Sequence, residues 1–224
     1  MRHTKRKLTG LGLVGICFFV GAIMMTTPGV AVADETMDYK ISKGGLLYDK
    51  WYAITDGDVP RKKHASYGDK GKKSGKTTWR CKECHGWDYM GKDGAYAKGS
   101  HFSGIKGIRA SAGKDPKKIA AVIRDKTHGY TKDYLTDGEV EALALFVSKG
   151  QIDMTKYIDL KSKAVKGDAN KGKPYYETMC SKCHGLDGKA IKDMKSVGNV
   201  ANANPWETLH KIANGQPAEK MEIV

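Results

Sequence analysis

The chain has 224 residues and a formal net charge of +14, and apolar residues make up 40% of it. This apolar fraction excludes an intrinsically disordered chain. With only four Phe but 27 Gly, the composition favours small lobes with thin cores. Lobes of that size often need covalent cross-links or a bound cofactor to be stable.

The first 33 residues have the features of a secretory signal peptide. Four basic residues lie near the start, and residues 8–25 are almost entirely apolar. Ala31-Val32-Ala33 then provides a small-residue cleavage site before Asp34. An uncleaved anchor is the alternative, because the apolar run, which includes Cys17, is long for a signal peptide. We therefore expect a periplasmic protein, or one anchored to the periplasmic face of the inner membrane.

Cleavage would remove four basic and no acidic residues, which leaves a net charge of +10 on the mature chain. Nucleic-acid binding is not expected of an exported protein. A basic surface fits redox partner proteins with acidic docking surfaces, or a membrane surface. It fits equally well a set of scattered, solvated lysines.

The first structural segment is predicted to begin with a helix near residues 44–54, where Leu46, Leu47 and Trp51 have helical spacing. Residues 55–78 are rich in Lys and Gly and are expected to form an exposed insertion. A C-x-x-C-H motif follows the insertion.

Two more helices complete this segment. Asp115-Pro116 opens a helix that runs to about residue 126, since Pro favours the first helical position. Thr136 and Glu139 form a capping box for a closing helix that ends at Gly150. Residues 151–166 are the predicted linker.

The second segment repeats the plan in a shorter form. Asp168 caps a helix predicted over residues 168–179, which leads directly into the second C-x-x-C-H motif. Asn204-Pro205 opens a further helix that ends before Gly215. No closing helix follows, and its absence would expose an apolar face of the lobe. We expect an all-α fold of two tandem domains, 34–150 and 167–224, the second truncated or covered by another chain.

Both segments contain C-x-x-C followed at once by His, which is the attachment motif of c-type haem. Each cysteine of such a motif forms a thioether with a haem vinyl group, and the adjacent histidine becomes the proximal iron ligand. The sequence therefore predicts two covalently bound haems c. Their attachment residues would be Cys81, Cys84 and His85 for haem 1, and Cys180, Cys183 and His184 for haem 2.

The C-x-x-C pairs alone also fit zinc, thiol redox chemistry or disulfides. A zinc site built from both pairs needs no adjacent histidine, and a thioredoxin-like motif belongs in a βαβ context that the sequence does not predict. With 7 His in 224 residues, two such neighbours would arise by chance roughly one time in a thousand. An export leader independently favours haem, because covalent haem attachment takes place outside the cytoplasm.

Residues 179–188 (MCSKCHGLDG) resemble the haem-binding run of class I c-type cytochromes, and residues 211–221 (KIANGQPAEKM) resemble that family's distal-ligand loop. The resemblance covers about residues 39–150 and 166–224, although the insertion of the first segment departs from it. The GGLLYD run at 44–49 also resembles the two-haem thiosulfate dehydrogenase and SoxA group. The class I resemblance implies Met221 as distal ligand of haem 2, where a thioether would raise the reduction potential. Core packing is the alternative role for Met221.

The distal ligand of haem 1 is less constrained, because no methionine lies between Gly91 and Asp153. Counting back from the closing helix favours His128. An ungapped alignment of the two segments instead places Lys132 opposite Met221. The remaining candidates are His101, Met90, His64 or an open site. His64 is otherwise expected to be solvated, and His210 to serve packing or lie at the surface.

We therefore expect an electron carrier between a dehydrogenase or quinol oxidoreductase and a terminal acceptor. No acid/base or nucleophile constellation appears, so no catalytic residue is predicted. One alternative is a haem enzyme that oxidises a small sulfur compound such as thiosulfate. Another is a cytochrome subunit of a larger oxidoreductase.

Overall fold

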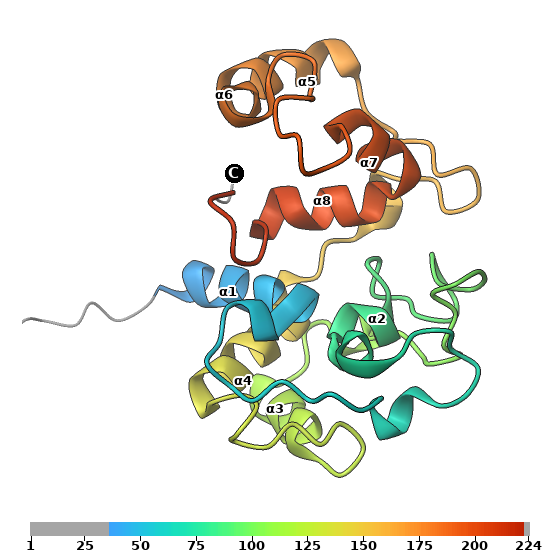
Figure 1. Ribbon diagram of the computed structural model, residues 1–224, viewed down its shortest axis with the longest axis vertical. Coiled ribbons are helices and arrows are strands. Elements are labelled where there is room, and N and C mark those ends of the chain that lie inside the picture. The colour runs from blue at the N-terminus through green and yellow to red at the C-terminus, as the bar shows by residue number, and fades with distance from the viewer. Residues whose placement is uncertain (1–35, 222–224) are drawn as a thin grey trace, which may run out of the picture. The chain divides into compact units, whose positions relative to one another are not determined.

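The computed structural model describes residues 36–221 (Figure 1). The chain divides into two units, and the second, Glu35–Val224, contains every described residue. The predicted signal peptide and Cys17 lie outside the described residues. Within residues 36–221 the fold is helical, with no strand beyond two isolated β-bridges, so the all-α prediction is confirmed. No described helix has both the length and the apolar character needed to cross a bilayer.

The first lobe, residues 36–150, contains four α-helices and several single turns. The α-helices are α1 (Met37–Lys50), α2 (Cys81–His85), α3 (Pro116–Arg124) and α4 (Asp137–Leu145). The turns are η1 (Trp51–Ala53), η2 (Ala65–Tyr67), η3 (Gly75–Trp79), η4 (Arg109–Ser111) and the π-helical η5 (Phe146–Gly150).

Local sequence accounts for most helix ends in this lobe. Asp115 caps α3 with Pro116 at the first position, and Thr136 and Glu139 form the predicted capping box of α4. The first helix is longer than predicted, because Thr36 accepts a hydrogen bond from the Tyr39 backbone and α1 begins seven residues before Gly44.

The second lobe, residues 167–221, consists of short helices. They are α5 (Ala169–Tyr175), the π-helical turn η7 (Tyr176–Cys180), α6 (Ser181–His184), α7 (Val197–Ala203) and α8 (Pro205–Asn214). Asp168 caps α5 and Asn204 caps α8, as predicted. Gly215 ends α8 with a φ of 87°, in the left-handed region that glycine adopts without strain.

Residues 151–166 connect the lobes through the turn η6 (Met154–Lys156) and an antiparallel bridge between Ile158 and Val165. Met154 and Ile158 are each only 2% exposed and belong to the core of the first lobe. The connection is therefore packed onto the first lobe at Met154 and Ile158, whereas residues 161–166 are exposed.

The main core lies in the first lobe and is rich in aromatic side chains. Its most buried members include Leu47, Tyr48, Trp51, Trp87, Tyr89, Leu143 and Phe146. Gly44 lets α1 approach α4, since a Cβ there would lie 2.1 Å from the Ala142 carbonyl oxygen.

Helix α8 of the second lobe also packs against α1 (Figure 1). Trp206 is 4% exposed and joins the core of the first lobe, and His210 is fully buried. Gly45 permits the approach, because a Cβ there would lie 2.3 Å from the Asn214 side chain. The second lobe thus contributes core residues to the first.

Candidate functional site

Both C-x-x-C-H motifs fold into one short helical turn that ends at a glycine. Gly86 follows His85 with a φ of 80°, and Gly185 follows His184 with a φ of 76°. The backbone N–H of Gly86 donates to the Lys82 carbonyl at 2.9 Å, and that of Gly185 donates to the Ser181 carbonyl at 2.7 Å. The two motifs therefore share one backbone conformation.

The loop after each motif also returns in the same way. The Gly91 N–H donates to the His85 carbonyl at 2.8 Å, and the Ala190 N–H donates to the His184 carbonyl at 3.0 Å. In both motifs this hydrogen bond holds the following loop beside the motif histidine and sets the direction in which the chain leaves the turn.

A tyrosine from the preceding helix braces each turn. The Tyr48 hydroxyl of α1 donates to the Gly86 carbonyl at 2.6 Å. The Tyr176 hydroxyl of η7 donates to the Gly185 carbonyl at 2.8 Å. In the second segment this tyrosine lies four residues before Cys180. In the first it lies 33 residues before Cys81, because the insertion comes between them.

The four motif cysteines are free thiols. Burial raises the pKa of Cys81 to about 11 and that of Cys84 to about 12. Thiol redox catalysis needs the opposite shift, because the thiolate is the reactive form. Nor does any group of three or more His, Cys, Asp or Glu side chains within residues 36–221 form a potential metal site. Within the described residues the two C-x-x-C pairs therefore do not come together into one group of donors.

The His85 side chain is held as a neutral imidazole with one defined orientation. Its Nδ1 donates to the Lys106 carbonyl at 2.8 Å, which leaves Nε2 as the free lone pair. Burial lowers the pKa of His85 to about 4, against the smaller opposing effect of the Lys106 carbonyl. A hydrogen bond from one ring nitrogen to a backbone carbonyl is the usual support of a metal-ligating histidine.

His128 lies against His85, with their ring centroids 6.2 Å apart and their planes at 31°. Its Nδ1 donates to the Asp125 carboxylate at 3.3 Å. Neither ring uses Nε2 in a hydrogen bond within the described part of the chain. Metal–imidazole bonds of about 2 Å, with about 1 Å from each nitrogen to its ring centre, imply a separation of about 6 Å for two rings on one ion. The spacing of the two rings therefore fits a six-coordinate iron between them.

The other sequence candidates for the distal position have different partners. Lys132 is exposed and its ammonium group lies 2.7 Å from the Asp137 carboxylate. The His101 ring stacks on Tyr96 with centroids 4.6 Å apart, and its Nδ1 lies 2.7 Å from the Glu83 carboxylate. Of the three ranked candidates, the structure brings only His128 next to His85.

His64 corrects one sequence expectation. It was expected to be solvated within the exposed insertion, but only 8% of its surface is accessible. Its Nε2 contacts the His128 carbonyl oxygen at 2.8 Å. The Lys/Gly-rich composition around His64 gave no sign of this burial, which depends on contacts 64 residues apart.

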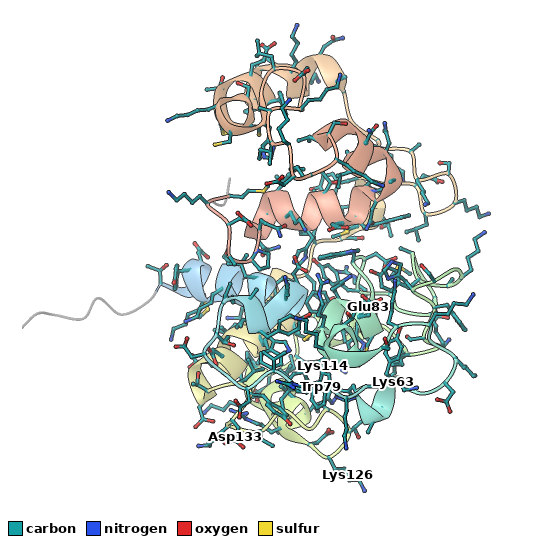
Figure 2. All side chains as sticks on the ribbon, viewed as in Figure 1. Lys63, Trp79, Glu83, Lys114, Lys126 and Asp133 are labelled. Carbon is teal, nitrogen blue, oxygen red and sulfur yellow. The ribbon has the colours of Figure 1, made fainter. Side chains whose placement is uncertain are left out.

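The two variable positions of the first motif carry an unexpected buried ion pair. Lys82 and Glu83 are 5% and 1% exposed, with Nζ and Oε2 2.9 Å apart (Figure 2 labels Glu83). Burial raises the pKa of Glu83, but the His101 hydrogen bond and the Lys82 charge outweigh it and hold the pKa at about 2. The carboxylate is therefore ionised and anchors His101 beside the motif.

The second motif is more open than the first. Cys183 is exposed and Cys180 is half-buried. The His184 Nδ1 is buried and has no hydrogen-bond partner among the described residues. Met221 is half-buried, and its carbonyl lies against Gly215. No described contact joins Met221 to His184, so its ligation stays a prediction.

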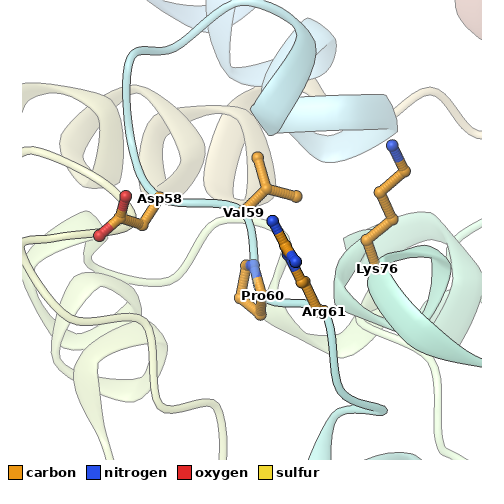
Figure 3. Close-up of a pocket in the computed structure, with 5 residues that line it drawn as sticks. All are labelled: Asp58, Val59, Pro60, Arg61 and Lys76. Carbon is orange, nitrogen blue, oxygen red and sulfur yellow. The ribbon is translucent and has the colours of Figure 1, made fainter.

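A surface hollow on the insertion is separate from both motifs (Figure 3). Arg61 and Lys76 bring positive charge to it and Asp58 brings negative charge, while Val59 and Pro60 complete its lining. It contains no cysteine or histidine and therefore adds nothing to the candidate ligand sets.

In comparisons with known proteins, the chain shows no significant match to a family model, a curated protein or a solved structure.

Proposed function

We propose that this protein is an exported two-haem c-type cytochrome that carries electrons between redox partners. The haems would be attached at Cys81 and Cys84 and at Cys180 and Cys183. The two lobes would correspond to tandem class I cytochrome c domains. The shared backbone conformation of the two motifs and the all-α fold support this proposal.

The observation that carries the proposal is the pair of imidazoles at the first motif. His85 follows a C-x-x-C pair directly in sequence, whereas His128 comes from the loop between α3 and α4. Their ring centroids nevertheless lie 6.2 Å apart, a separation that is compatible with one shared metal ion. Neither Nε2 has a hydrogen-bond partner among the described residues, so both are available as metal ligands.

In this proposal the protein residues hold and orient the ligands. The Lys106 carbonyl accepts from His85 Nδ1 and so fixes the tautomer whose Nε2 is available to iron. The Asp125 carboxylate does the same for His128. When bound, haem supplies the one-electron redox chemistry, and the protein sets its potential and its docking.

The two sites would differ in potential because their ligand sets differ. Two imidazoles at haem 1 favour a lower potential than the imidazole and thioether that His184 and Met221 would provide at haem 2. Electrons would therefore pass downhill from haem 1 to haem 2. The basic mature surface would favour donors and acceptors with acidic docking faces in the periplasm.

Mass spectrometry of protein from a host that attaches haem c tests the proposal. The mature chain should carry two covalent haems. The double variant Cys180→Ser/Cys183→Ser should carry one, and Cys81→Ser/Cys84→Ser is the matched variant for the other site. Purified protein with reactive thiols and bound zinc, or with no haem, would contradict the proposal.

A further inference from the structure

Part of the Lys/Gly-rich insertion is fixed to the body of the first lobe. The His64 ring packs on Trp79 with centroids 4.3 Å apart, and the His64 backbone N–H donates to the Thr78 hydroxyl at 2.8 Å. The Trp79 indole N–H in turn donates to the Lys62 carbonyl at 2.9 Å (Figure 2 labels Trp79 and Lys63). We call residues 62–66 the strap.

The hydrogen bonds of His64 define its tautomer. The Ser66 backbone N–H donates to His64 Nδ1 at 3.1 Å, so Nδ1 is the unprotonated nitrogen. Nε2 therefore carries the proton and donates to the His128 carbonyl at 2.8 Å. This bond connects the strap directly to the residue whose ring lies against His85.

A second bond holds the same loop. The Ser66 hydroxyl donates to the Thr127 carbonyl at 2.5 Å. On its other side the loop is held by Asp125, whose carboxylate accepts from the Thr127 and His128 backbone N–H groups at 2.8 and 3.0 Å. Two consecutive carbonyls of the His128 loop are thus fixed by the strap, and two consecutive N–H groups by Asp125.

We propose that His64 is a positioning residue for His128, and that the strap keeps the His128 imidazole on the iron of haem 1. The inference rests on the proposed function, because it assigns His128 as an iron ligand. Without the strap bonds, the His128 loop would open more often and leave the sixth coordination position of haem 1 free for an external ligand.

Replacement of His64 in the holoprotein tests the inference. The variant His64→Ala removes the bond to His128, whereas His64→Gln retains an amide N–H that can donate to the same carbonyl. Lys63→Ala is the matched control, because Lys63 belongs to the strap but its ammonium group contacts Gly68 and Asp69 at the surface. Haem 1 is followed through the low-spin ferric signal that disappears in His128→Ala.

The expected result in His64→Ala is a weaker ferric low-spin signal of haem 1 in the oxidised protein and faster carbon monoxide binding in the reduced protein. Loss of one hydrogen bond should raise the open population about fivefold, and the rate of ligand binding should rise by the same factor. His64→Gln and Lys63→Ala should behave like the wild type. Equal rates in wild type and His64→Ala, or a failure of His64→Gln to restore the slow rate, would overturn the inference.

Haem counting separates this inference from the proposed function. Wild-type protein without haem would overturn both. Two haems in wild type and His64→Ala with unchanged ligand binding would overturn the positioning role alone. If His64→Ala lost haem 1 during maturation, Ser66→Ala would decide, since it removes only the bond to Thr127: faster ligand binding supports the inference and an unchanged rate overturns it.

Discussion

Gly44 and Gly172 lie at equivalent places in the two lobes, each four residues before the tyrosine that braces its motif. A Cβ on Gly44 would lie 2.1 Å from the Ala142 carbonyl oxygen of α4, whereas a Cβ on Gly172 would meet nothing within 4 Å. The equivalent residues directly before the two tyrosines differ in the same way. Leu47 is fully buried and Tyr175 is 67% exposed.

The difference between the lobes comes from tertiary packing around a shared local structure. Trp51 is fully buried, but its counterpart Met179 in the second lobe is 46% exposed. Helix α8 packs against α1 of the first lobe, so its apolar face adds to the core there. The motif turn needs only its own hydrogen bonds and one tyrosine, whereas the burial of the helix before it depends on distant helices.

The largest predicted effect is that of the same substitution at the two equivalent glycines. Gly44→Ala should destabilise the holoprotein by about 3 kcal/mol or more, because the clashing atom is a backbone carbonyl that cannot turn aside. Gly172→Ala should instead stabilise it by up to about 1 kcal/mol, because alanine favours an exposed helix. Denaturant unfolding of both variants measures the difference.

A small effect at Gly44 would show that α1 and α4 are less closely packed than the structure places them. A large loss of unfolding free energy in Gly172→Ala would also contradict the comparison, because it would mean that a neighbouring segment covers α5. Circular dichroism before unfolding confirms that both variants remain helical, and haem counting confirms that both are fully loaded.

The second prediction concerns His210, through which the two lobes share one core. Its Nε2 donates to the Gly45 carbonyl at 3.0 Å, and its Nδ1 accepts from the Tyr89 hydroxyl at 2.9 Å. Burial is the main cause that lowers the pKa of His210 to about 4. The folded state therefore holds a neutral imidazole, while the unfolded chain takes up the proton near its ordinary pKa of 6.5.

The sign follows from proton binding by the two states. Between pH 6.5 and 4 the unfolded chain binds more protons at His210 than the folded chain does. The contribution of the neutral imidazole to the free energy of unfolding is therefore fully present above pH 6.5 and is lost as the pH falls towards 4. The shift corresponds to at most about 3 kcal/mol. Unfolding of wild type and His210→Gln at pH 7.5 and 4.5 measures it, and the variant should lose less stability on acidification. Identical losses would mean that His210 is not buried as a neutral group.

The sequence predicted the fold where the determinants are local. The predicted caps are found at the N-termini of the expected helices: Asp168, Asn204 and the capping box of Thr136 and Glu139. They could be predicted because capping involves residues only two or three positions apart. The sequence did not predict the placement of α8, since the contact between His210 and Gly45 joins residues 165 positions apart. Periodicity identifies an apolar face but not the helix that will cover it.

In the candidate site, too, the local features were predicted from the sequence and the long-range contacts were not. The C-x-x-C-H motifs are visible in the sequence because the proposed haem attachment needs residues that are adjacent in the chain. For the proposed distal position of haem 1, the sequence left His128, Lys132 and His101 as ranked candidates, and of these the fold places only His128 beside His85. Asp137 holds Lys132 at the surface, and Asp125 and His64 hold the loop that brings His128 to His85. The sequence listed His64 as a minor distal candidate and otherwise expected it to be solvated. Its burial was not predicted, because it depends on contacts such as that with the His128 carbonyl, which no sequence pattern reveals.

The smallest predicted effect uses the two bracing tyrosines, whose hydrogen bonds are alike but whose surroundings differ. Tyr48 is 1% exposed, so Tyr48→Phe removes the shorter of the two hydrogen bonds to the buried Gly86 carbonyl and leaves only the 3.3 Å bond from the Tyr89 N–H. Because water cannot replace the lost hydroxyl there, the protein should be destabilised by about 1 kcal/mol. Tyr176 lies in the open lobe, where water can replace its hydroxyl, and Tyr176→Phe should cost only about 0.5 kcal/mol. Denaturant unfolding of the two variants gives the ratio. Equal losses would indicate that the second lobe excludes water as well as the first does, and the contrast between a packed and an open motif would then be wrong.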